Sequence, residues 1–196
     1  MIAAGTSKGF SVIQGMSDPA KPVGQNTLAD YLAAEISEYS GELPRVVVTG
    51  HSLGGCLTTV VAPFLKVEFA KHSLAPTILP YTFAGPSAGN SDYAKFFDET
   101  FAHNYRYFNS LDIIPHWWAS LPAIETIYAE VWDWPPDLVR KYFEGKGDEI
   151  KSNGLNYKQL SSGNRELVGA IEGADKWVAE AAHQHHITTY IKLLSN

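Results

Sequence analysis

The sequence predicts an α/β fold with a mainly parallel central sheet and helices on both of its faces. Short runs rich in β-branched and aromatic residues alternate along the chain with longer segments of helical spacing. Two of the short runs are almost wholly apolar, which is typical of strands buried within a parallel sheet. The chain has 196 residues, the length of one domain. We therefore expect residues 1–196 to form a single domain.

The first clear element is a helix within residues 26–44. Asn26 or Thr27 can cap its N-terminus, and Asp30 suits its first turn. The spacing of its larger apolar residues is helical. This spacing predicts a buried face made of Leu28, Tyr31, Leu32, Ile36 and Tyr39.

The next segments alternate between strand and helix patterns. Residues 45–50 form a β-branched run, which predicts a strand buried on both faces. A helical pattern extends from residue 54 to about residue 72, and Pro63 predicts a kink or an early end within it. A second strand is expected over 77–86, a helix over 91–102 and a third strand over 104–110.

The chain is less regular from residue 117 to residue 164. The stretches "WDWPPD" and "EGKGDE" interrupt it, and residues 151–164 have the composition of a loop. A helical pattern returns over 165–182, and a short helix follows "HQHH". Tryptophans near one another in this region could line an acyl pocket or serve as ordinary core aromatics. They are Trp117, Trp118, Trp132 and Trp134.

Composition restricts the classes of partner. The net charge is −6 and is spread without long runs, so the chain has no electrostatic footprint for nucleic acid or anionic membranes. The single cysteine, Cys56, excludes an intramolecular disulfide and is expected to be a buried thiol. No apolar stretch reaches the ~18 residues of a transmembrane helix. The first residues lack a signal peptide, but an export signal could lie upstream, so the compartment is left unassigned.

The most specific chemical signal is "VVVTGHSLGG", residues 46–55. A strand, a G-x-S-x-G motif and a helix together form the context of a nucleophile elbow, which predicts Ser52 as a nucleophile held in a strained turn. Gly50 and Gly54 are expected to flank Ser52 because side chains there would collide with the neighbouring strand and helix. The following helix directs its amides at the same point, so the Leu53 N–H is the expected first oxyanion donor. The alternative is a Gly-rich turn with an incidental serine.

A nucleophilic serine needs a histidine base and an acid that orients it, in the chain order Ser, Asp or Glu, His. Asp112 follows the third predicted strand and suits the acid, although it could be a solvated loop residue. The base candidates near the C-terminus are His183, His185 and His186, and spacing within the chain leaves the choice open. A metal site is a competing interpretation of H-x-H-H, but no matching carboxylate spacing supports it.

Five blocks occur in an order that matches a known family. They are "KGF" at 8–10, "VVVTGHSLGG" at 46–55, "YTFAGPSAGN" at 81–90, "RYFNSLDIIP" at 106–115 and "HHITTYI" at 185–191. With these blocks the chain resembles the class 3 lipases, the fungal-type triacylglycerol lipases of the α/β-hydrolase superfamily. The resemblance extends from about residue 8 to residue 193 and is loose over 117–180. It implies an α/β-hydrolase fold and a carboxylic-ester hydrolase.

The resemblance also selects among the histidines. Tyr190 lies five residues after His185, as the family's last block requires, so His185 is the expected base. His186 is the second choice and His183 the third.

The chain departs from the family pattern at two places. Ser87 stands where the family usually has arginine, so a local ion pair is expected to be missing. The family's upstream strands, oxyanion loop and lid helix are also expected to be missing, as in a short variant, a truncated gene or a piece of a longer protein. "GTS" at 5–7 resembles that oxyanion loop, which makes Thr6 a weak candidate for the second donor.

The predicted function is a serine lipase or esterase that cleaves acyl glycerides or short-chain esters through an acyl-enzyme on Ser52. The predicted mechanism requires no metal and no cofactor. The expected partner is a small-molecule or lipid ester, with a lipid–water interface as a further expectation. Phospholipase A1 and feruloyl esterase activities share the same machinery. The alternative is a catalytically silent module that binds a lipid or a protein.

Overall fold

A parallel sheet of four strands forms the centre of the molecule. The computed structural model describes residues 1–42, 44–132, 135–174 and 176–195. The strand order is β1 (Arg45–His51), β2 (Thr77–Phe83), β4 (Tyr105–Asn109) and β6 (Asn164–Leu167), and each neighbouring pair is parallel. Two short strands, β3 (Gly89–Asn90) and β5 (Tyr157–Lys158), form a separate antiparallel pair. The predicted mainly parallel sheet is confirmed.

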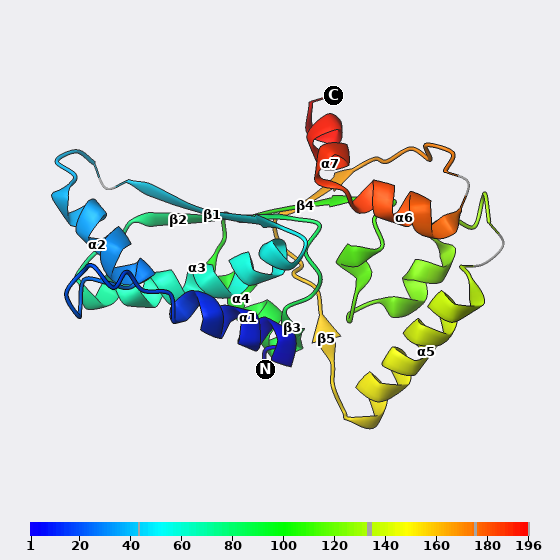
Figure 1. Cartoon of the computed structure of the whole chain (residues 1–196), viewed down its shortest axis with the longest axis horizontal. Coiled ribbons are helices and arrows are strands. Elements are labelled where there is room, and N and C mark those ends of the chain that lie inside the picture. The colour runs from blue at the N-terminus through cyan, green and yellow to red at the C-terminus, as the bar shows by residue number, and fades with distance from the viewer. Residues whose placement is uncertain (43, 133–134, 175, 196) are drawn as a thin grey trace.

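Helices lie on both sides of this sheet (Figure 1). One side carries α1 (Ala4–Gln14), α2 (Leu28–Glu38), α3 (Leu53–Lys71) and α4 (Ser91–Thr100). On the other side, α7 (Ile187–Leu194) stands beside β4 and follows directly on α6 (Trp177–His185). Helix α5 (Asp137–Ser152) lies away from the sheet on the side of α6, and 3-10 turns occupy Ile114–His116 and Leu121–Thr126. The predicted α/β class is confirmed.

The two faces of β1 are covered unequally. Val46 and Val48 pack against the core formed by α2 and α3. Val47 points to the other face, where its side chain is 55% exposed. The prediction that this strand is buried on both faces is therefore wrong. The reason is that α7 covers the opposite face only near the carboxyl ends of the strands, leaving the middle of β1 open.

Aromatic pairs stabilise the less covered face of the sheet. Tyr81 of β2 stacks on Tyr105 of β4 with ring centroids 4.4 Å apart. Phe83 stacks on Tyr107 in the same way at 5.1 Å. Parallel pairing places these residues directly opposite each other, so cross-strand ring contacts stabilise the register of β2 and β4.

Helix α2 begins with the predicted cap. Thr27 Oγ1 accepts a hydrogen bond from the Asp30 amide, and Asp30 Oδ2 accepts one from the Thr27 amide, each at 3.2 Å. The predicted apolar face is partly wrong, because Tyr31 and Tyr39 are exposed. Ile36 is buried and Leu32 packs against the core, as predicted. In place of the tyrosines, the small residues Ala29 and Ala33 are buried.

Helix α3 continues past Pro63, so the predicted early end does not occur. A proline inside a helix leaves the carbonyl four residues earlier without its usual amide donor. Here that carbonyl belongs to Thr59, and it accepts a hydrogen bond from the Tyr93 hydroxyl of α4 at 2.8 Å. The packing of α4 thus replaces the hydrogen bond that Pro63 removes.

Helix α3 is also long and apolar enough to cross a bilayer by length and composition, with a mean hydropathy of 1.4. Half of this segment is buried within the fold. Core helices of globular domains have the same character. The expected absence of a membrane-spanning segment stays a prediction.

Two expectations for the second half are wrong. Helix α5 runs through "EGKGDE", because Phe143 is buried and Arg140 Nη1 pairs with Glu144 Oε1 at 2.9 Å. These contacts outweigh the cost of about 1 kcal/mol for each helical glycine. Residues 164–167, predicted as helix from 165, form β6 because they pair with β4. The helix begins at Trp177.

Candidate active site

Ser52 lies in a strained turn between β1 and α3. Its backbone has φ 58° and ψ −123°, and positive φ is unfavourable for a residue with a side chain. The Ser52 amide donates to the Phe83 carbonyl at 2.9 Å, which holds the turn against β2. Such strain is typical of a functional position. The backbone is that of the nucleophile elbow predicted from the sequence.

The glycines around Ser52 have different roles. A Cβ on Gly50 would lie 2.3 Å from the carbonyl carbon and oxygen of Gly54, so only glycine fits at position 50. A Cβ on Gly54 would meet no atom within 4 Å, so the collision predicted there is wrong. The tight contact occurs one residue later, where a Cβ on Gly55 would lie 2.7 Å from the Phe83 oxygen.

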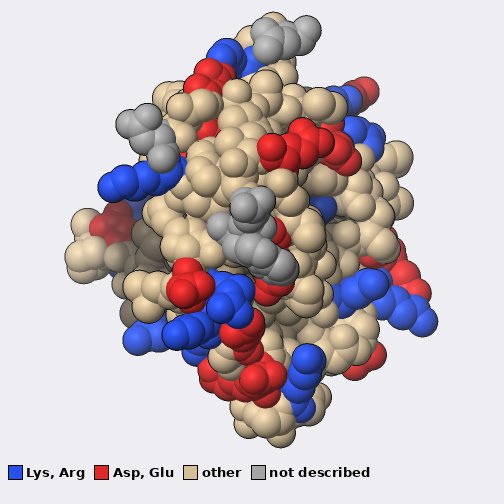
Figure 2. All heavy atoms as spheres, turned by 90° about the vertical axis from the view of Figure 1, so that its right-hand side faces the viewer, with Lys and Arg blue, Asp and Glu red and all other residues tan. Residues whose placement is uncertain are grey.

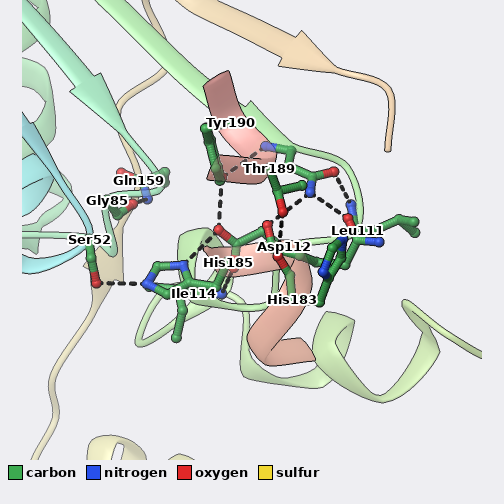
Figure 3. A network of polar contacts seen from close by, with 12 residues as sticks. Ser52, Gly85, Leu111, Asp112, Ile114, Gln159, His183, His185, Thr189 and Tyr190 are labelled. Atoms are coloured by element: carbon green, nitrogen blue, oxygen red, sulfur yellow. Dashed lines mark hydrogen bonds and ion pairs between the residues drawn. The ribbon is translucent and has the colours of Figure 1, made fainter. Parts of the chain in front are cut away.

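Three predicted residues meet at the carboxyl end of the sheet (Figure 3). His185, the last residue of α6, lies between Ser52 and Asp112. Its Nε2 is 2.8 Å from Ser52 Oγ, and its Nδ1 is 2.8 Å from Asp112 Oδ2. Asp112 comes from the loop after β4. The structure thus brings together a hydroxyl, an imidazole and a carboxylate in one line of hydrogen bonds.

Asp112 is fully buried, with 0% of its surface exposed. A buried carboxylate needs hydrogen-bond donors to offset its lost hydration. The Ile114 amide donates to Oδ1 at 2.9 Å, and the Tyr190 hydroxyl donates to Oδ2 at 2.7 Å. Burial and the adjacent Asp112 charge raise the pKa of Tyr190 above its usual range. Tyr190 therefore remains a neutral donor that holds Asp112 in place.

The other C-terminal histidines point elsewhere. His186 caps α7, where its Nδ1 contacts Thr188 Oγ1 at 2.8 Å. His183 remains on α6, and its carbonyl accepts a hydrogen bond from Thr189 Oγ1 at 2.6 Å. Within the described ranges no group of His, Cys, Asp and Glu is arranged to hold a metal ion. Among the histidines of the described ranges, only His185 lies within hydrogen-bond distance of both Ser52 and Asp112.

His51, which directly precedes the serine, is a neighbour of the site and packs there, as expected for a histidine beside the elbow. Its ring centroid lies 4.8 Å from that of His185 and 5.4 Å from that of Tyr190. Burial, and then the charge of a protonated His185, lower the pKa of His51 below its usual value. A neutral ring is therefore packed against the imidazole of His185. Its place directly before the serine in "GHS" was the available signal.

The expected oxyanion donors lie at two helix starts. Leu53 is the first residue of α3, and Thr6 lies in the first turn of α1. Amides at these positions have no partner within their own helix. Both residues line the same cavity as Ser52. Thr6 Oγ1 contacts Cys56 Sγ at 3.3 Å, and burial raises the pKa of this thiol, in agreement with its predicted structural role.

The cavity in front of Ser52 has a volume of about 520 Å³. Trp117 and Trp118 line it, so two of the four tryptophans reach the site. Trp132 packs on Tyr128 in the core beneath it, with ring centroids 5.9 Å apart. Trp134 lies outside the described residues. The position of Trp117 is stabilised by Ser87, the residue that replaces the family's arginine, because its Oγ donates to the Trp117 carbonyl at 3.1 Å.

A buried polar network behind Asp112 was not predicted. Glu180 is fully buried, and burial alone would raise its pKa. Hydrogen bonds from Gln184 and from the amides of Glu172 and Ala174 lower the pKa instead. Gln184 Oε1 in turn accepts from Asn109 Nδ2 at 2.7 Å. Because Asn109 ends β4, this network fixes α6 to the strand that precedes Asp112.

Comparison with known proteins extends these observations. The family model "Lipase (class 3)" matches residues 3–121. The M37 lipase, known from a crystal structure, is similar with a TM-score of 0.84 and 31% identity over 99% of this chain and 57% of that one. This likeness confirms an α/β-hydrolase fold.

Two curated relatives match shorter regions. The lipase ZK262.3 of Caenorhabditis elegans is 33% identical over 84 residues, which are 43% of this chain and 23% of the worm protein. The chloroplastic phospholipase A(1) DAD1 of Arabidopsis thaliana is 33% identical over 95 residues, 46% of this chain and 21% of the plant protein. The aligned regions thus span less than a quarter of each of these two relatives. The family match covers more than half of this chain, and the chain belongs to the class 3 lipase family.

Proposed function

We propose that the chain is a serine carboxylic-ester hydrolase that cleaves acyl glycerides or simpler esters through an acyl-enzyme on Ser52. The observation that supports this most directly is the line of hydrogen bonds from Ser52 through His185 to Asp112, with both distances at 2.8 Å. The strained backbone of Ser52 and the membership in a lipase family support the same proposal.

In this mechanism, His185 Nε2 takes the proton of Ser52 Oγ while the oxygen attacks the ester carbonyl. The carbonyl oxygen becomes negative and accepts a hydrogen bond from the Leu53 N–H, with the Thr6 N–H as the proposed second donor. The bond to the alcohol oxygen then breaks, and His185 returns the proton to that oxygen. Water repeats the same steps, releases the carboxylic acid and restores Ser52.

Asp112 is proposed to orient His185 by accepting the Nδ1–H and to stabilise the imidazolium that forms. Its own position is held by the Ile114 amide and the Tyr190 hydroxyl. His51 remains neutral in this arrangement, because burial lowers its pKa. It therefore adds no second positive charge beside the imidazolium.

The test is hydrolysis of p-nitrophenyl butyrate together with labelling by a fluorophosphonate probe and peptide mapping. Ser52→Ala should abolish both hydrolysis and labelling. The matched control is Ser37→Ala, an exposed serine of α2, which should retain both. Equal hydrolysis by the wild type and Ser52→Ala would contradict the proposal. A folded wild type that takes no label would favour the alternative, a binding module.

A further inference from the structure

A second cavity adjoins the site on the side of His185. It has a volume of about 600 Å³, within the range of ligand pockets. The start of α5, the helix α6 and the loop after Asp112 form its walls. Among its lining residues are Ile113, Leu138, Tyr142, Phe143, Trp177 and Val178.

The two cavities meet at a common wall. Ile114 and Trp117 line both of them, whereas Ser52 lines only the first and His185 only the second. Helix α5 passes along both cavities. Its first half, with Leu138, lines the second cavity, and its second half, with Ile150, lines the first. Ser52 therefore borders the first cavity, and His185 borders the second.

The chemistry of ester cleavage distinguishes these spaces. The carbonyl oxygen must face the Leu53 amide, which lines the first cavity. The alcohol oxygen must lie near His185 Nε2, because it receives its proton there. The group attached to the alcohol oxygen consequently extends on the side of His185, where the second cavity opens.

We propose that the second cavity binds an aliphatic chain carried by the alcohol half of the substrate. The inference rests on the proposed function and narrows its substrate class to neutral esters with a chain on each side of the scissile bond, such as diacylglycerols. Leu138 is 82% exposed and Val178 is 52% exposed at the rim, so a bound chain would remove apolar surface from water.

The charges around this cavity favour a neutral alcohol half over one that carries phosphate. No lysine or arginine is among the described residues that line the cavity. On the face that carries α5 and α6, acidic and basic side chains are interspersed around a broad uncharged area (Figure 2). Among the described residues, the walls of this cavity therefore lack the basic side chains that bind a phosphate strongly.

The experiment compares butyrate esters of methanol, butanol and octanol, assayed as monomers. The kcat/KM should rise with the length of the alcohol, by up to about fourfold for each methylene that is fully buried. In Val178→Gln, the ratio of octyl to methyl ester kcat/KM should fall severalfold. The dependence on acyl chain length, measured with methyl butyrate and methyl octanoate, should persist.

The matched control is Val67→Gln, because Val67 is 58% exposed and lies on α3, outside the residues that line either cavity. The ratio of octyl to methyl ester kcat/KM in Val67→Gln should equal that of the wild type. Thermal melting checks that each variant folds. A flat alcohol profile, or equal loss in both variants, would overturn the inference while the proposed function stands. Faster cleavage of dioctanoylphosphatidate than of dioctanoylglycerol would overturn the neutral substrate class. Absence of hydrolysis and of Ser52 labelling would overturn both proposals.

Discussion

The hydroxyl of Tyr190 connects the buried acid to the end of β4, and its removal tests that connection. The hydroxyl donates to Asp112 Oδ2 at 2.7 Å and accepts a hydrogen bond from the Asn109 amide at 3.0 Å. Tyr190→Phe keeps the ring, which is 1% exposed and packed on His51. The variant therefore removes two hydrogen bonds and leaves the shape of the core almost unchanged.

The expected loss of stability follows from these two contacts. A hydrogen bond to a charged group contributes about 1.5–3 kcal/mol, and a buried amide left without a partner costs about 1–3 kcal/mol. Together they give a decrease of roughly 2.5–6 kcal/mol in the free energy of unfolding, a large part of the usual 5–15 kcal/mol. Asp112 keeps its contacts with Ile114 and His185. If about half of the lost bond energy serves to orient Asp112, kcat falls by about three- to tenfold.

The assay combines urea unfolding with kcat for p-nitrophenyl butyrate, and Tyr93→Phe is the matched control. The Tyr93 hydroxyl makes one hydrogen bond, to the neutral Thr59 carbonyl, and lies outside the Ser52 cavity. Its loss should cost about 1–2 kcal/mol and leave kcat unchanged. If Tyr190→Phe were no less stable than Tyr93→Phe, or retained full kcat, the hydroxyl would not position Asp112.

Three other predictions concern the same site. In ester hydrolysis, His185→Ala should lower kcat/KM by at least ~10³-fold and His186→Ala by less than about twofold. The reverse ranking of the two variants would show that His186, and not His185, is the base. Gly50→Ala should prevent folding, because the added Cβ would collide with the backbone of residue 54. Gly54→Ala should raise the free energy of unfolding by up to about 1 kcal/mol, because alanine is favoured over glycine in a helix and the added Cβ meets no atom. Thermal melting followed by circular dichroism measures both effects. Burial lowers the pKa of His51 in the folded state, so the unfolded chain binds its proton first as pH falls below the ordinary value of 6.5. The midpoint temperature of thermal unfolding should therefore decrease as the pH is lowered from 7 to 5, and the decrease should be smaller in His51→Gln. An equal decrease in both proteins would show that His51 does not cause this pH dependence.

Local signals in the sequence predict the elements that position Ser52. The β-branched run, the cap at Thr27 and the glycine at position 50 each depend on neighbouring residues, so their structural roles are visible without tertiary information. Asp112 and His185 follow from chain order and from the family spacing. The structure places all three side chains within hydrogen-bond distance of one another.

The remaining features depend on contacts between distant segments. Pro63 is compatible with α3 only because Tyr93 of another helix supplies a donor. Glu180 would be placed at the surface by any rule based on polarity, yet loop amides and Gln184 satisfy it in the interior. Val47 is exposed because none of the helices in the described part of the chain covers that part of β1, and the composition of the strand does not reveal this.

The long separation between the members of the triad has a consequence for folding kinetics. His185 is 73 residues from Asp112 and 133 residues from Ser52 along the chain. Contacts between distant residues form slowly, since the cost in chain entropy precedes the gain in contacts. The turn at Ser52 is local and can form early, but the contact of Ser52 with His185 must wait until α6 docks. The rate at which a refolding chain becomes reactive towards fluorophosphonate therefore reports this docking step, separately from the earlier return of helical circular dichroism.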